Sequence, residues 1–430
     1  MSKDILDRLL AGRLPDPDGA GQLAVATRRV EIAPSVAGGE AALVAALGFG
    51  RPLAVVLDPT TRRVLGARVA AALAGSQEVV LDGTPKPDME TVSELRRRTA
   101  GAAALIAVGS GTINDLCKYA AFLDDKPYAV FGTAPSMNGY TSVNAAITEH
   151  GHKKSLPARA AAGVFLDLAV LAAAPARMIR AGLGDSICRP TAQADWLLAH
   201  LLLGQPYRSA PFALLAADEA ALLARPAALL AGDAGAMELL ARTLILSGFG
   251  MTICGGSYPA SQGEHLISHY IDMLGDPGWP AALHGEHIAV TTLTMARLQE
   301  RMLGGAAPVL HPTGSDEAAL RRHFGPELGA SCWAAFSRKA LDGERAAALS
   351  AKLAAGWPAI RRALAAVTRP AAQLEAVLRA AGAPTRSDDI HVPAAFYREA
   401  VRHAREIRDR YTFLDLAGDA GLLEPFALAA

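Results

Sequence analysis

Four histidines lie close together in the sequence, in the segments GEHLISHY and LHGEHIAV. His265 and His269 are four residues apart, a spacing that places both on one face of a helix. His284 and His287 follow in the second segment, and Asp185 in GLGDSICRP is predicted to come after a glycine turn, at the start of a helix. Imidazoles and a carboxylate commonly hold a catalytic divalent metal with open positions for substrate. One aspartate and two histidines from three helices would suit such a site, although histidine pairs at this spacing also arise by chance.

A second segment that could bind a ligand is IAVGSGTINDLCKYAA, residues 106–121. It combines an expected strand, a glycine turn and a helix. Glycines allow a phosphate to approach the backbone, and a helix N-terminus supplies N–H donors and partial positive charge. The segment is neither a Walker loop nor a complete GxGxxG fingerprint, so an ordinary strand-to-helix turn is an equal alternative. The polar loop GTAPSMNGYTS, residues 132–142, follows the next expected strand and is predicted at the same edge of the sheet.

Asp58 ends another strand-like run, VVLDP. In nucleotide-binding sheets, an acidic residue at the carboxyl end of a strand often binds a ribose hydroxyl and favours NAD over NADP. Taken alone, Asp58 fits a solvated loop aspartate equally well.

The elements that must position these residues follow an alternating pattern. Apolar strand-like runs at 52–59, 77–83, 103–111 and 127–136 are separated by helix-like runs, which predicts an α/β domain with a parallel, doubly wound sheet. Residues 142–171 suggest a hairpin that turns at EHGHKK. After about residue 175 the chain is rich in alanine and leucine at helical spacing. We therefore expect an α/β nucleotide-binding domain over 1–170 and an all-helical metal- and substrate-binding domain over 171–430.

Composition excludes several classes of protein. The 430 residues include 42 basic and 42 acidic side chains, so no global charge points to nucleic acid or to an anionic membrane. The four cysteines are widely spaced and form no CxxC motif, which fits a reducing cytosol. The N-terminal segment lacks the apolar core of a signal peptide, and no run is predicted to span a bilayer. We expect a cytoplasmic protein without membrane insertion.

Several motifs in the same order resemble the glycerol-1-phosphate dehydrogenases, including their bacterial branch. These motifs are VGSGTINDLCKYAA, TAPSMNGYTS, GLGD, PASQGEHLISHY, LHGEHIAV and IRDRYTFLDLA, and the resemblance covers roughly residues 50–420. The family belongs with the dehydroquinate synthases, glycerol dehydrogenases and iron-containing alcohol dehydrogenases. The resemblance implies a dehydroquinate synthase-like fold.

The resemblance also implies roles for individual residues. Asp185, His265 and His284 would be the metal ligands, and His269 would face the substrate. The expected metal is zinc, with nickel and iron as alternatives. The segments implied to bind NAD(H) or NADP(H) comprise Gly109, Ser110, Gly111, Thr112, Ile113, Thr133, Ala134, Pro135, Ser136 and Ser142.

One position departs from the family pattern. The family loop reads TAPSMDGY, and its aspartate binds the substrate hydroxyls, whereas this chain has Asn138. An amide keeps the shape of the acid but loses its charge and gains donors. Asn138 is therefore predicted to touch the substrate and to tune its choice. Lys153, Lys154 and Arg159 are candidate partners of a substrate phosphate, although a basic hairpin is more often only solvated.

The expected reaction is the NAD(P)H-dependent interconversion of dihydroxyacetone phosphate and sn-glycerol 1-phosphate, or of a close phosphorylated analogue. A proton would arrive through water or His269. Alternatives are a dehydrogenase of non-phosphorylated polyols, a dehydroquinate synthase-like cyclase and an inactive nucleotide-binding relative. The apolar, helix-rich composition makes a homodimer the expected assembly.

Overall fold

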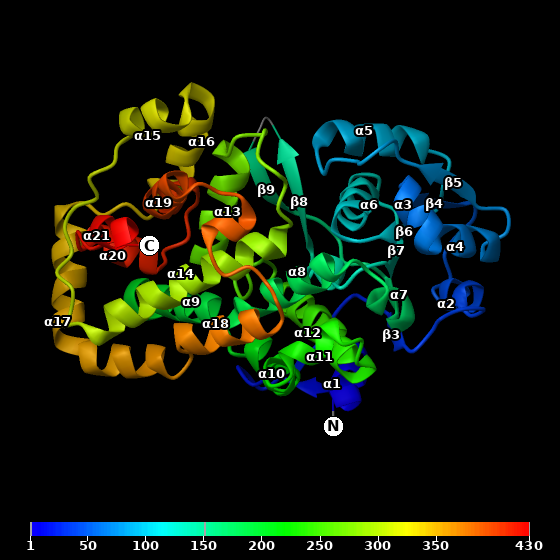
Figure 1. The fold of residues 1–430 in the computed structure, drawn as a ribbon, viewed down its shortest axis with the longest axis horizontal. Helices are drawn as coiled ribbons and strands as arrows, with labels where there is room; N and C mark the ends of the chain where they lie inside the picture. Colours follow the sequence, from blue (N-terminus) through cyan, green and yellow to red (C-terminus); the bar gives the residue numbers. More distant parts are fainter. Residues whose placement is uncertain (1, 150–151, 430) are drawn as a thin grey trace. The chain divides into compact units, whose positions relative to one another are not determined.

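The computed structural model describes residues 2–149 and 152–429 (Figure 1). The chain forms two compact units, Met1–Ser186 with Arg208–Ser257, and Ile187–Tyr207 with Tyr258–Ala430. The boundary predicted after residue 170 follows the change from strands to helices. The first unit, however, continues past this boundary to Ser186 and so includes most of α8 (Ala176–Ile187). It also includes the later helices α10 (Ala210–Leu223), α11 (Pro226–Leu230) and α12 (Ala234–Ile253).

A six-stranded parallel sheet forms the centre of the first unit, which confirms the predicted fold class. The strands lie in the order β3-β10-β7-β6-β4-β5. Their bounds are β3 (Arg29–Ala33), β4 (Leu53–Leu57), β5 (Gln77–Val80), β6 (Ala104–Gly109), β7 (Tyr128–Gly132) and β10 (Gly163–Asp167).

Helices cover both faces of this sheet, which explains why its central strands are apolar throughout. Alternate residues of β4, such as Val55, join a buried cluster with Val44 and Val69 on one face. The other face packs against α6, which contacts β4, β6 and β7. The helices of these layers are α2 (Glu40–Ala45), α3 (Pro59–Thr61), the π-helical segment η1 (Arg62–Gly66), α4 (Ala67–Ala72), α5 (Met89–Arg98) and α6 (Gly111–Leu123).

The order of the strands creates a switch point between β4 and β6. The chain passes from β4 outward to β5, and then returns across β4 to β6 and β7. Ligands of open α/β sheets bind at the carboxyl ends of the strands on either side of such a reversal. The loops after β4 and β6 therefore lie at the position where open α/β sheets bind ligands.

The expected hairpin is present as β8 (Asn144–Glu149) and β9 (His152–Pro157), which pair antiparallel. Residues 150–151 of the predicted EHGHKK turn lie outside the described residues. The next run, GVFLD, is not part of the hairpin. It forms β10, which pairs in parallel with both β3 and β7 because it is buried on both sides. The smaller elements of this unit are α1 (Ser2–Leu10), β1 (Leu14–Pro15), β2 (Gln22–Leu23), η2 (Gly139–Thr141), α7 (Leu168–Ala172) and α8 (Ala176–Ile187).

The second unit consists of helices around one large apolar core. Helix α13 packs against α9, α14 and α19, so it lies inside the unit (Figure 1). The helices are α9 (Arg189–Leu203), α13 (Gly263–Leu274), α14 (His284–Gly304), α15 (Glu317–Phe324), α16 (Pro326–Phe336), α17 (Gly343–Ala365), α18 (Ala371–Ala380), η3 (Ser387–Ile390), α19 (Ala394–His403), η4 (Ala404–Ile407), α20 (Phe413–Asp419) and α21 (Leu423–Ala429).

Helix α12 is long and apolar enough to cross a membrane by length and composition alone. The prediction that no run is long enough to span a bilayer is therefore wrong as regards length and composition. Within the protein, 72% of its most apolar window is buried, and it packs against α10 and η2. These contacts are those of a core helix.

Candidate active site

Three histidines come together in the second unit. His265 and His269 lie one turn apart on α13, and His284 is the first residue of α14. The ring centroids of His265 and His284 are 5.1 Å apart, and the ring of His269 lies 6.1 Å and 6.2 Å from those two. The structure therefore groups three of the four clustered histidines. His287 is engaged elsewhere, since its Nδ1 lies 3.4 Å from Asp272 Oδ1 on α13.

Glu264 orients the ring of His265. Its Oε1 lies 2.9 Å from His265 Nδ1 and also accepts the backbone N–H of Gln262 at 2.8 Å. Its Oε2 accepts the hydroxyl of Thr191 at 3.2 Å. A proton on Nδ1 leaves the lone pair of His265 on Nε2, the arrangement typical of metal-binding histidines. These donors fit a divalent metal. The sequence analysis gave Glu264 no role, although its position directly before a predicted ligand was a usable signal.

Asp185 belongs to the first unit and lies near the C-terminal end of α8. The predicted glycine turn before it is wrong, because Gly182 lies within the continuous helix. A Cβ on Gly182 would stand 1.7 Å from the carbonyl oxygen of Pro135, so only glycine lets this loop approach the helix. The approach allows the backbone N–H of Asn138 to donate to Asp185 Oδ2 at 2.7 Å. Asp185 is thus oriented by the loop that carries the unusual asparagine.

Asn138 has a partner for its amide on α12. Its Nδ2 donates to Ser247 Oγ at 3.2 Å. The same loop is fixed to α12 by Thr141, whose hydroxyl donates to the Ile245 carbonyl at 2.7 Å. A serine hydroxyl can accept from an amide or donate to a carboxylate, so Ser247 accommodates either an asparagine or an aspartate at position 138.

The predicted nucleotide-binding segments meet at the carboxyl edge of the sheet. Gly109 and Gly132 end β6 and β7 in register, and the backbone N–H of Thr133 donates to the Gly109 carbonyl at 3.2 Å. A Cβ on Gly109 would lie 2.6 Å from Ile113 Cβ, so glycine is required for α6 to start this close to the strand. Thr133, Ala134, Pro135 and Ser136 therefore continue from the strand beside the glycine turn.

Asp58 lies at the end of β4, beside β6. Its Oδ1 accepts the backbone N–H groups of Thr60 and Thr61 at 2.7 Å and 2.8 Å, which caps α3. The structural role of an N-cap is thus observed, and it uses one carboxylate oxygen. A role toward a ribose stays a prediction.

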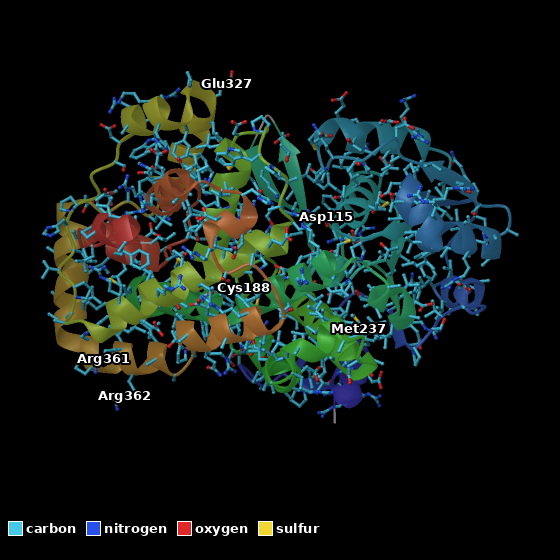
Figure 2. The ribbon with its side chains drawn as sticks, in the orientation of Figure 1. Asp115, Cys188, Met237, Glu327, Arg361 and Arg362 are labelled. Atoms are coloured by element: carbon cyan, nitrogen blue, oxygen red, sulfur yellow. The ribbon has the colours of Figure 1, made fainter. Side chains whose placement is uncertain are left out.

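A buried lysine supports this edge of the sheet and was not assigned a role from the sequence. Lys118 on α6 donates to Gly139 O at 2.6 Å, to Ser142 Oγ at 3.0 Å and to Asn144 O at 2.8 Å. Burial lowers the pKa of its ammonium group, and the carboxylate of Asp115, labelled in Figure 2, partly offsets that effect. Ser142, predicted to contact the nucleotide, is itself buried in this network.

The candidate phosphate partners on the hairpin have carboxylate neighbours at the surface. Lys154 Nζ lies 2.6 Å from Glu149 Oε2, and Arg159 Nη2 lies 2.6 Å from Asp125 Oδ1. Lys153 precedes Lys154 on β9, and Arg159 follows the end of that strand. Exposed ion pairs of this kind are typical of a solvated hairpin.

Known proteins resemble the chain over most of its length. Residues 31–175 match the family model described as iron-containing alcohol dehydrogenase. The glycerol-1-phosphate dehydrogenase of Bacillus licheniformis is 30% identical over 379 residues, which cover 86% of this chain and 83% of the relative. The chain belongs to the glycerol-1-phosphate dehydrogenase family. The resemblance stated from the motifs is confirmed, and the protein is an oxidoreductase.

Other members of the family and its fold agree with this assignment. The glycerol-1-phosphate dehydrogenase of Pyrococcus furiosus is 34% identical over 286 residues, 66% of this chain and 81% of the relative. The solved structure of a probable glycerol dehydrogenase from Sinorhizobium meliloti has a TM-score of 0.60 at 20% identity, and covers 94% of this chain and 98% of that one. The structural likeness supports the fold alone.

Proposed function

We propose that the protein catalyses the NAD(P)H-dependent reduction of dihydroxyacetone phosphate to sn-glycerol 1-phosphate, and the reverse reaction. The observation that carries the proposal is the group of His265, His284 and His269, with the tautomer of His265 fixed by Glu264. Relatives from Bacillus licheniformis and Pyrococcus furiosus are named as glycerol-1-phosphate dehydrogenases that use NAD(P)+.

Asp185, His265 and His284 are the proposed ligands of one divalent metal, with zinc expected first and nickel or iron as alternatives. Chain continuity supports the inclusion of Asp185. It precedes Cys188 by three positions, and Cys188, Glu264 and His265 form a buried group whose possible ligand atoms lie within 4.8 Å of one another. A carboxylate with two imidazoles suits a catalytic site that keeps a position open.

The nucleotide is proposed to lie at the switch point between β4 and β6. The backbone N–H groups at the start of α6 would bind its pyrophosphate, because Ser110 does not cap that helix with its side chain. Gly111 keeps the approach open, and Asp58 at the end of β4 would accept from a ribose hydroxyl, which favours NAD. The loop from Thr133 to Ser136 would contact the nucleotide from β7.

The remaining residues orient the substrate and move a proton. When bound, NAD(P)H supplies the hydride, and the metal supplies a Lewis acid for the carbonyl group. The ring centroid of His269 lies 6.1 Å and 6.2 Å from those of the two proposed histidine ligands, and His269 would give a proton to the developing alkoxide. Asn138 would hold the substrate hydroxyls through its carbonyl oxygen, since its Nδ2 is directed to Ser247.

A substrate panel tests this proposal. The metal-reconstituted protein is assayed with NADH and with dihydroxyacetone phosphate, dihydroxyacetone, glyceraldehyde 3-phosphate and longer ketose phosphates. We expect the highest kcat/KM with dihydroxyacetone phosphate, and loss of both metal and activity in His265→Ala. The matched control His311→Ala removes an imidazole outside this group. A preference for dihydroxyacetone would favour the non-phosphorylated polyol dehydrogenase instead.

The expected assembly is a cytoplasmic homodimer, and light scattering of the metal-loaded protein measures its mass. The proposal for the reaction does not depend on that result.

A further inference from the structure

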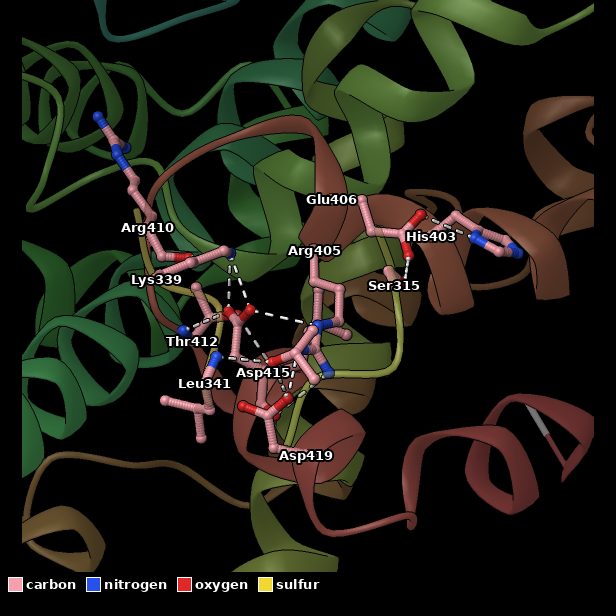
Figure 3. Close-up of polar contacts among 12 residues, drawn as sticks. Ser315, Lys339, Leu341, His403, Arg405, Glu406, Arg410, Thr412, Asp415 and Asp419 are labelled. Atoms are coloured by element: carbon pink, nitrogen blue, oxygen red, sulfur yellow. Dashed lines mark hydrogen bonds and ion pairs between the residues drawn. The ribbon is translucent and has the colours of Figure 1, made fainter. Parts of the chain in front are cut away.

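The late segment IRDRYTFLDLA is built around a buried network of ion pairs (Figure 3). Lys339 Nζ lies 2.9 Å from Asp415 Oδ1, and Arg405 Nε lies 3.3 Å from the same oxygen. Arg405 also pairs with Asp419. All four side chains are buried, and each cation of the network faces a carboxylate. The charges of these four side chains therefore offset one another within the network.

This network fixes the backbone that carries two further arginines. Lys339 Nζ donates to the carbonyl oxygen of Arg410 at 2.5 Å, and the backbone N–H of Thr412 donates to Asp415 Oδ2 at 2.8 Å. Figure 3 shows the Arg410 side chain extending away from the carboxylates of the network. The network thus fixes the backbone from which the Arg410 side chain extends.

Arg410 extends toward the segment that precedes α13, the helix of His265 and His269. Its Nη1 donates to the carbonyl oxygen of Ser261, and its guanidinium lies 4.7 Å from the centroid of the Tyr258 ring. Ser261 precedes His265 by four residues. The carboxylate of Glu264, the partner of His265, also acts on the guanidinium of Arg410. Arg410 is therefore close to the start of α13.

Arg408 lies two residues earlier, directly after η4, which packs against α13. Its Nη2 is buried and has no hydrogen-bond partner among residues 2–149 and 152–429. The neighbouring Asp409 is exposed and lies 3.5 Å from Arg338 Nη1. Burial, together with the charge of Arg410, lowers the pKa of Arg408 to about 9. Two cations are held together here, and one keeps a buried donor without an acceptor.

A buried donor of this kind is costly unless a ligand supplies its acceptor. Guanidinium groups match the oxygens of a phosphate in geometry and charge. Lys154 of the hairpin and Arg159, which follows it, already have carboxylate neighbours at the surface. We propose that Arg408, with Arg410 beside it, binds the phosphate group of the substrate. The proposal rests on the proposed function, because it assigns the phosphate end of that same substrate.

The test compares a phosphorylated with a non-phosphorylated ketone. For the metal-loaded, full-length protein, kcat/KM is measured with dihydroxyacetone phosphate and with dihydroxyacetone, and the readout is the ratio of the two. We expect Arg408→Met to lower this ratio about tenfold or more, because hydrogen bonds to a charged group are lost. Arg408→Lys keeps the positive charge but loses the paired N–H donors of the guanidinium, so it should lower the ratio less. The control Arg362→Met removes an exposed arginine of α17, labelled in Figure 2, and should leave the ratio unchanged. A ratio within twofold of the native value in both Arg408 variants would overturn the assignment.

A binding measurement separates this inference from the proposed function. Inorganic phosphate is titrated calorimetrically into the native protein and into Arg408→Met, without substrate or NADH. We expect the native protein to bind phosphate and the variant to bind it at least tenfold more weakly. That result supports Arg408 even if neither ketone is reduced, in which case only the proposed reaction fails. Equal binding by both proteins, or no binding by the native protein, contradicts the role of Arg408.

Discussion

The chemistry of single residues in this protein depends on a neighbour that orients each of them. Glu264 sets the tautomer of His265, and the backbone N–H of Asn138 orients Asp185. Such neighbours normally matter for metal affinity almost as much as the ligands do. Asp185 and His265 were candidate ligands from their residue types, because few side chains bind divalent metals, and the family resemblance then named them as ligands, which stays a prediction. Their orienting partners could not be predicted, since Asn138 and Asp185 are 47 positions apart.

At the residue scale, Asn138→Asp tests whether position 138 binds the hydroxyl groups of the substrate. A carboxylate accepts stronger hydrogen bonds from hydroxyls than an amide does, by about 1 kcal/mol, which is about fivefold in rate. Ser247 can reverse its hydroxyl and donate to the new carboxylate. We therefore expect kcat/KM for dihydroxyacetone phosphate to rise about fivefold.

The matched control for this change is Ser247→Ala in the native background. It removes the partner of Nδ2 and should lower kcat/KM, because the amide is then free to rotate. If Asn138→Asp and the native protein have the same substrate profile, position 138 does not contact the substrate.

At the scale of elements, the start of α13 is held by one buried carboxylate. Asp195 Oδ2 accepts the backbone N–H of Gly263 at 2.9 Å, and its Oδ1 accepts that of Phe413 at 3.0 Å. Burial raises the pKa of Asp195 well above its usual range, and the charge of Glu264 adds to this effect. Asp195 therefore joins α13 to the late segment that contains Phe413. These contacts link residues far apart in the sequence, so no local sequence pattern could predict them.

Asp195→Asn should therefore destabilise the start of α13. The new NH₂ group would face a backbone N–H, so one buried donor loses its acceptor, at a cost of about 1–3 kcal/mol. We expect a lower midpoint of thermal unfolding and a weaker metal affinity, measured by competition with a chelator. Asp342→Asn is the control, because Asp342 caps α17 at the surface and asparagine caps equally well. Native-like metal affinity in Asp195→Asn would show that α13 does not need this contact.

The edge between β4 and β6 gives a second prediction at this scale. Asp58→Ser keeps an N-cap for α3 but removes the carboxylate that would repel a 2′-phosphate. We expect the preference for NADH over NADPH to become smaller, with little change in stability. Dissociation constants measured for both nucleotides decide this. Equal affinities in the native protein would leave Asp58 with its capping role alone.

For the whole molecule, the sequence predicted the central strands and the helices that flank them better than it predicted the edge of the sheet and the boundary between the two units. Alternating apolar runs gave β4, β5, β6 and β7, because each is flanked by helices of clear periodicity. The edge strand β3 and the neighbouring β10 were not predicted as parts of the sheet, since their partners come from distant segments. The same holds for α10–α12, whose helical pattern does not reveal that they pack in the unit of the sheet.

The most direct test of the account is the configuration of the product. The metal-loaded protein is supplied with dihydroxyacetone phosphate and NADH, and the glycerol phosphate formed is assigned with enzymes specific for each enantiomer. A pocket that fixes the phosphate, the hydroxyls and the carbonyl group presents one face of the ketone to the nicotinamide. We expect sn-glycerol 1-phosphate alone, and no glycerol phosphate from His265→Ala. Formation of sn-glycerol 3-phosphate, or no reduction by the metal-loaded native protein, would contradict it.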